Sequence, residues 1–202
     1  METIKKTPQR IMLVLLKALI VKYTATSLSK ELKMSRWGIW KILKKLESEE
    51  LITIESLGTG KTSTRTIKLN WNNVLTEKVL ALYLAQEALK YKRWRFNFEK
   101  LEKEVEFLIL FGSILQSPKQ ANDIDILGVT KENKIGKIGN IVLKIQQTQN
   151  KKIHSINFTK KELKQELKER NKAFIDAIKE GIVLFGQEKF VRFMKEMHGH
   201  GS

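Results

Sequence analysis

Two expected strands, and the polar residues within and directly after them, constrain the fold of this chain more than any other feature. Phe107–Phe111 is a run of five apolar residues, typical of a short buried strand, and it ends at Gly112-Ser113. Asp123–Val129 begins with alternating polar and apolar residues, which predicts a second strand. Because successive side chains of a strand point to opposite faces, we expect Asp123 and Asp125 on the same face.

This combination of residues predicts a metal and phosphate site. Asp123 and Asp125 repel each other, and Mg²⁺ commonly binds through one or two carboxylates together with substrate phosphates. Gly112 allows the backbone to approach a ligand closely, and Ser113 can open a helix whose free N–H groups face an anion. The alternative interpretation is a buried turn followed by a solvated acidic strand end.

The first seventy residues have the pattern of a winged helix-turn-helix. We expect a helix from Thr7-Pro8 to about Tyr23, a short second helix, and a third that begins after Ser35. Two strands with a Gly-rich tip between them follow, at Leu51–Glu55 and Thr64–Leu69.

The sequence after residue 70, taken with the first seventy residues, predicts an α+β fold in which a helical linker leads to a small mixed-sheet domain. Residues 135–149 are expected to form a helix, residues 153–159 a third strand, and the rest helices with an interruption at Gly181–Gly186. The predicted parts are a winged helix-turn-helix domain at 1–70, a linker at 71–103, a nucleotidyltransferase-like domain at 104–197, and a disordered or cloning-derived tail at 198–202.

The order of these motifs resembles a known superfamily. Phe111-Gly112-Ser113, followed by Ser-Pro-Lys-Gln-Ala-Asn-Asp-Ile-Asp at 117–125, is similar to the signature of the DNA polymerase β-type nucleotidyltransferases. The pattern is similar to that of small archaeal nucleotidyltransferase-domain proteins with an N-terminal helix-turn-helix. The resemblance implies that Gly112, Ser113 and the nearby amides hold a nucleoside triphosphate, and that Asp123 and Asp125 are catalytic and bind Mg²⁺ or Mn²⁺.

A third carboxylate, which the resemblance implies on a later strand, is missing from the expected position. The strand at 152–159 contains no acid, and His154 occupies the place where the acid is expected. Glu132 is the only carboxylate between Asp125 and Glu162. A neutral imidazole can act as a base, or His154 can be an ordinary hydrogen-bonded strand residue.

Residues 35–52, which run from Ser35-Arg-Trp-Gly-Ile-Trp to Glu-Glu-Leu-Ile52, resemble the recognition helix and first wing strand of MarR-like winged helices. In such proteins the helix enters the major groove while the wing contacts the DNA backbone. The resemblance makes DNA the expected partner and RNA the alternative. Trp37 and Trp40 are unusual at such positions, and they either stack on unpaired bases or pack against another domain or a second subunit, as in a homodimer. The expected nucleic-acid contacts are Arg36, Lys41, Lys44, Lys45, Lys61 and Arg65.

Composition narrows the classes of function further. The formal net charge is +16, which suits a polyanionic partner or simply keeps the protein in solution. The absence of cysteine excludes disulfides, thiolate catalysis and Cys-based zinc sites. No segment is apolar and long enough to cross a bilayer, so a cytoplasmic location is expected.

The sequence as a whole therefore predicts a protein that binds NTP with Mg²⁺ and transfers a nucleotidyl group to a nucleic-acid or protein acceptor, with the winged helix as its targeting module. One alternative is a DNA-binding regulator with a catalytically silent nucleotidyltransferase domain. Another is an antitoxin-like component.

Overall fold

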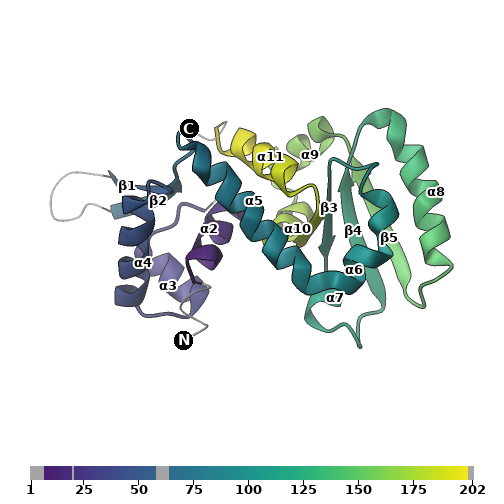
Figure 1. The fold of residues 1–202 in the computed structure, drawn as a ribbon, viewed down its shortest axis with the longest axis horizontal. Helices are drawn as coiled ribbons and strands as arrows, with labels where there is room; N and C mark the ends of the chain where they lie inside the picture. Colours follow the sequence, from purple (N-terminus) through teal and green to yellow (C-terminus); the bar gives the residue numbers. More distant parts are fainter. Residues whose placement is uncertain (1–6, 20, 58–63, 200–202) are drawn as a thin grey trace. The chain divides into compact units, whose positions relative to one another are not determined.

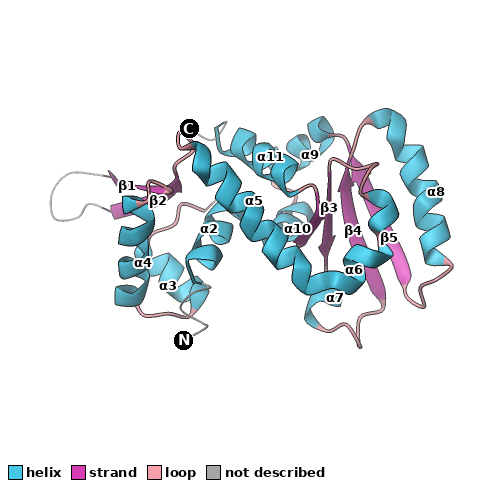
Figure 2. Ribbon diagram, viewed as in Figure 1, coloured by secondary structure: helices cyan, strands magenta, loops and turns pink. Residues whose placement is uncertain are grey.

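The computed structural model describes residues 7–19, 21–57 and 64–199, and the chain divides into two compact units at Tyr83/Leu84. Figure 2 shows strands paired as a ribbon in the first unit and as a larger sheet in the second. Helices and strands occur in both, so the predicted α+β class is confirmed. Lys61, predicted as a nucleic-acid contact, and residues 200–202 of the predicted tail lie outside the described residues.

In the described part of the first unit, three helices precede an antiparallel ribbon (Figure 1), and a further helix follows it. Ile11, Leu28, Ile39 and Leu43 are fully buried, because each helix presents apolar residues at helical spacing to one core. The elements are α2 (Thr7–Lys17), α3 (Ala25–Leu32), α4 (Arg36–Ser48), β1 (Ile52–Leu57) and β2 (Thr64–Leu69).

The first helix is shorter than the sequence predicts. It ends at Lys17 instead of continuing to about Tyr23, and the carbonyl of Tyr23 accepts a hydrogen bond of 2.8 Å from the Ile67 amide. Tyr23 thereby forms an isolated bridge to the ribbon, and Thr24 caps α3 by accepting from the Ser27 amide. The bridge gives the Tyr23 carbonyl a hydrogen-bond partner outside any helix, and the cap gives one to the Ser27 amide at the start of α3. The backbone therefore does not need to continue the first helix to Tyr23.

The predicted linker is divided between the two units. The helix α5 (Val74–Ala88) crosses the boundary, and the Gln9 side chain donates a hydrogen bond of 3.1 Å to the Tyr83 carbonyl in the first unit. The segment that follows is helical, with Trp94, Phe98 and Leu101 buried in the core of the second unit. It consists of η2 (Leu89–Tyr91), α6 (Lys92–Asn97) and η3 (Glu99–Leu101).

The second unit is built on a four-stranded sheet in the order β5-β4-β3-β6. The strand β3 pairs antiparallel with both β4 and β6, and β4 pairs parallel with β5. The fourth strand lies where the sequence indicated only an interruption between helices. The strands are β3 (Phe107–Phe111), β4 (Asp123–Val129), β5 (Lys152–Phe158) and β6 (Ile182–Phe185).

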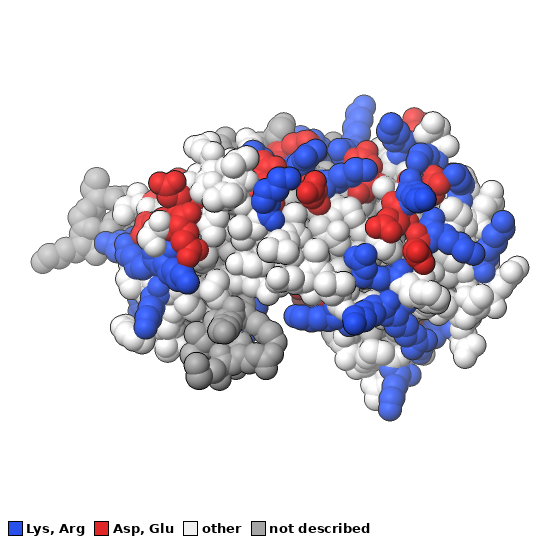
Figure 3. Space-filling view, viewed as in Figure 1, with Lys and Arg blue, Asp and Glu red and all other residues white. Residues whose placement is uncertain are grey.

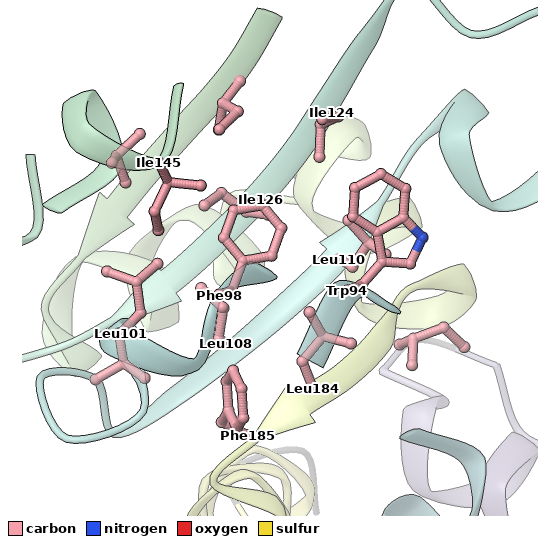
Figure 4. Close-up of a cluster of buried hydrophobic side chains, with 14 of the residues drawn as sticks. Trp94, Phe98, Leu101, Leu108, Leu110, Ile124, Ile126, Ile145, Leu184 and Phe185 are labelled. Carbon is pink, nitrogen blue, oxygen red and sulfur yellow. The ribbon is translucent and has the colours of Figure 1, made fainter. Parts of the chain in front are cut away.

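Helices cover both faces of this sheet. On one face, α6 and α8 (Ile135–Gln146) bury a cluster that includes Leu108, Leu110, Ile124 and Ile126 (Figure 4). On the other face, Phe107 packs edge-on against Phe190, with ring centroids 5.3 Å apart. The helices of this second face are α9 (Lys160–Lys168), α10 (Lys172–Glu180) and α11 (Gln187–Gly199). The last of these continues through His198 and Gly199, which the sequence placed in a disordered tail.

Candidate metal centre and basic surface

The strand β4 places Asp123 and Asp125 on the sheet face that α9, α10 and α11 cover. The alternation of the strand buries Ile124 and Ile126 on the opposite face, so both carboxylates emerge together as the sequence predicts. They are partly shielded, since 33% of the Asp123 side chain and 22% of the Asp125 side chain are exposed.

The parallel strand β5 adds His154 to this pair. His154 lies opposite Asp125 in the register of the two strands. Its Nδ1 atom is 3.3 Å from Oδ1 of Asp125 and 3.5 Å from Oδ2 of Asp123. One potential ligand atom from each of the three residues lies within 4.8 Å of the others, so the group can hold a metal ion.

The Gly112 bend faces the same carboxylates. Phe111 is the register partner of Asp125, so the bend at the end of β3 lies beside the start of β4. Gly112 has φ of +81°, and a Cβ atom built there would overlap Oδ2 of Asp125. Ser113 follows as the exposed first residue of the short helix α7 (Ser113–Gln116). Only glycine combines this backbone conformation with the approach to the carboxylate.

The electrostatics of the pair favour a bound cation. Burial raises the pKa of Asp125 above its ordinary value, and the neighbouring charge of Asp123 raises it further. The hydrogen bond from His154 acts in the opposite direction but does not cancel these effects. A divalent ion would relieve the repulsion and the loss of solvation together.

Glu132, the other candidate for a third ligand, lies elsewhere. It belongs to η4 (Glu132–Lys134), beyond the end of β4 opposite to Asp123, and it lines a different hollow with Asn157 and Phe158. At about 3.3 Å per strand residue, the length of β4 alone separates it from Asp123 by roughly 20 Å and from Asp125 by roughly 13 Å. Within the described ranges, the group that could hold an ion therefore contains His154 and no third carboxylate.

A cavity of about 390 Å³ opens beside the Gly112 bend. Asp176 and Glu180 project into its lining from one face of α10, four residues apart. This cavity could not be predicted from the sequence, because Asp and Glu at this spacing also occur on any solvated helix face. The remaining lining residues are Tyr91, Phe111, Leu115, Gln116, Ala173, Ala177 and Ile182.

The predicted basic contacts of the first unit differ in their surroundings. Lys44 forms an ion pair of 2.8 Å with Glu47, and Lys45 approaches Glu49 at 3.7 Å. Figure 3 shows Lys and Arg side chains next to Asp and Glu side chains on the part of the surface around α4. Arg36, Lys41 and Arg65 are exposed, and in the described part of the chain they form no ion pair. These three are therefore the contacts best able to meet a phosphate.

Comparison with known proteins identifies no relative. No protein-family model, no curated protein and no solved structure matches the chain. Among the described residues, no helix has the length and apolar character needed to span a membrane.

Proposed function

We propose that this chain is a nucleotidyltransferase-like protein that binds a nucleoside triphosphate with a divalent metal ion. The observation that carries the proposal is the convergence of Asp123, Asp125 and the Gly112 bend at one end of a sheet. In the reaction, an acceptor hydroxyl gives up its proton to water or a base and forms a bond to the α-phosphorus, while the bond to the β-phosphate breaks and pyrophosphate leaves with the bonding electrons.

The donor set fits a divalent cation. Asp123 and Asp125 supply the carboxylate oxygens that suit Mg²⁺ or Mn²⁺, whereas the imidazole of His154 suits transition ions better than Mg²⁺. A bound ion would neutralise phosphate charge as the bond to the leaving group breaks. Gly112 lets the bend approach Asp125 closely, and Ser113, the next residue, would contact the triphosphate through its amide and hydroxyl.

The cavity beside the bend suits the nucleoside part of the substrate. Its volume lies within the usual range of small-molecule sites. Tyr91 and Phe111 offer aromatic surface to a base, and Asp176 and Glu180 offer acceptors for amino or hydroxyl groups. The first unit, in this proposal, is a winged helix that delivers the protein to a nucleic acid.

A nucleotide-binding experiment tests the site. Replacing Asp123 and Asp125 together with Asn should abolish metal-dependent binding of a fluorescent NTP analogue. Glu99→Gln with Glu102→Gln removes the same number of charges from exposed positions and serves as the control. Unchanged binding by the Asn double variant would exclude the assignment.

A second function is favoured by the donor set itself. His154 in place of a carboxylate is expected in a silent nucleotidyltransferase domain that serves as a sensor within a DNA-binding regulator. Incubation with labelled NTP, Mg²⁺ or Mn²⁺ and candidate acceptors separates the two. Transfer of the label by the wild type, but not by the Asp123→Asn, Asp125→Asn variant, favours the enzyme. Sequence-specific binding to duplex DNA without transfer favours the regulator.

A further inference from the structure

The first unit contains a groove that the metal site does not involve, and we name it the Trp37 groove. Its volume is about 770 Å³, which is ample for one nucleotide. It lies where the starts of α3, α4 and β2 meet. Its lining residues are Thr24–Thr26, Arg36, Trp37, Trp40, Thr64 and Arg65.

Trp37 offers this groove a large uncovered aromatic surface. It is 75% exposed, although a tryptophan gains much from burial. Trp40, one helical turn later, is half-buried and has Lys44 and Arg65 over its ring, at 5.3 Å and 5.5 Å from the centroid. Among the described residues, the Trp37 ring has one cation–π contact, with Lys41 at 5.7 Å from the centroid. The indole of Trp37 is therefore the ring that remains available to a ligand.

Cations border the aromatic surface on both sides. Arg36 precedes Trp37 on α4, and Arg65 reaches the groove from β2. Thr24 is already engaged, since its hydroxyl accepts from the Ser27 amide in a capping box. The cations that line the groove are the two arginines, whose planar guanidinium groups suit phosphate.

These features select one kind of occupant. A second copy of the chain, joined through a two-fold contact at this groove, would bring the cations Arg36, Lys41 and Arg65 of both copies into one interface. Double-stranded DNA also fits poorly, because its major groove presents base edges while the base faces are stacked on one another. An unpaired nucleotide has a free face for the indole and a phosphate for the arginines.

We infer that the Trp37 groove binds an unpaired nucleotide of a single-stranded nucleic acid, with the base stacked on Trp37 and the phosphate held by Arg36 and Arg65. The inference rests on the targeting role proposed for the first unit. It does not depend on the aspartates of the second unit. The first unit then recognises a single-stranded end, loop or bulge instead of reading a duplex.

Fluorescence anisotropy with two labelled oligonucleotides tests this inference without any NTP. A mixed-sequence single strand should bind about tenfold more tightly than a long duplex, in which unpaired bases occur only at the few ends. Trp37→Ala should weaken single-strand binding by about tenfold, and Trp37→Phe should retain most of it. Because Trp37 is exposed, its replacement leaves the core intact. Phe96→Ala is the matched control, since Phe96 is 77% exposed in the other unit and should have no effect.

The outcomes that overturn the inference are distinct. If both oligonucleotides bind with equal affinity and Trp37→Ala has no effect, the first unit recognises duplex DNA and the inference is wrong. Failure to bind either oligonucleotide would remove the targeting role as well. A dimer that sedimentation detects in the wild type and that Trp37→Ala dissociates would make the groove a contact between copies. The Asp123→Asn, Asp125→Asn protein should bind the single strand normally, so a failure of the metal site is recognised separately.

Discussion

His154 lies opposite Asp125 across the parallel strands β5 and β4, with Nδ1 3.3 Å from the carboxylate oxygen Oδ1. Neither residue is near the other in sequence, and only the register of the strands brings them together. A nitrogen ligand thereby joins two oxygen ligands at the candidate metal centre. The identity of the third ligand should decide which metal the site prefers.

Replacing His154 with Asp should change that preference. A third carboxylate adds a hard oxygen ligand, so the affinity for Mg²⁺ should rise about tenfold while the affinity for Co²⁺ relative to Mg²⁺ falls. Isothermal titration calorimetry with each metal alone measures both constants. Asn140→Asp, on the exposed side of α8, adds the same charge on the other face of the sheet and should leave the ratio unchanged. An unaltered ratio in His154→Asp would show that His154 is not a ligand.

Asp125→Asn should stabilise the protein when no metal is present. The pKa of Asp125 is raised in the folded state, mainly by burial, so the folded protein holds this proton more tightly than the unfolded chain does. The free energy of unfolding therefore falls as the pH rises from the unfolded pKa through the folded one, and it remains lowered at neutral pH. Asn removes this penalty.

Thermal unfolding at pH 7 measures the effect of Asp125→Asn. The Tm should rise by about 2 °C, as expected for a change of less than 1 kcal/mol in a chain of this size. The difference from the wild type should shrink at a pH below the unfolded pKa, where both proteins are uncharged at this position. Added metal should raise the Tm of the wild type and have little effect on the variant. A lower Tm for metal-free Asp125→Asn would contradict the electrostatic account.

The sequence contained enough information for the carboxylate pair and for the place of His154. Strand periodicity alone puts Asp123 and Asp125 on one face, and an apolar strand that ends in Gly112-Ser113 is a local signal. The strand Ile182–Phe185 was missed because four apolar residues between two glycines are compatible with several structures. Its assignment depends on pairing with β3, which lies about seventy residues earlier.

The cavity and the Trp37 groove were beyond sequence reasoning for a similar reason. Each is lined by residues from elements distant in the chain, such as Tyr91 with Asp176, or Trp37 with Arg65. The charges of Lys44 and Lys45 were likewise counted as available, whereas the structure pairs them with Glu47 and Glu49. Neighbouring acids at helical spacing were a signal that could have predicted these two pairs.

Gly112→Ala should destabilise the protein and weaken its metal site together. Gly112 has φ of +81°, and the added Cβ atom would overlap the Asp125 carboxylate. A cost of about 1–3 kcal/mol is expected from the backbone conformation alone. Chemical denaturation measures the stability, and calorimetry measures metal binding. Gly139→Ala on α8 is the control, because a Cβ atom there meets no atom within 4 Å and alanine favours a helix. Equal stability of Gly112→Ala and the wild type would contradict the tight approach of the bend to Asp125.

Ala173→Trp should separate nucleotide binding from metal binding. Ala173 is an exposed residue on the rim of the cavity beside Gly112, so a large side chain there should occupy the space without disturbing the core. If the nucleoside lies in this cavity, NTP affinity should fall about tenfold, which corresponds to about 1.4 kcal/mol. Binding of Mn²⁺ alone should not change, because the aspartates and His154 are untouched. Lys172→Trp, at the neighbouring exposed position outside the lining, is the control. Normal NTP affinity in Ala173→Trp would place the nucleoside elsewhere, while loss of Mn²⁺ binding would show that the substitution distorts the sheet.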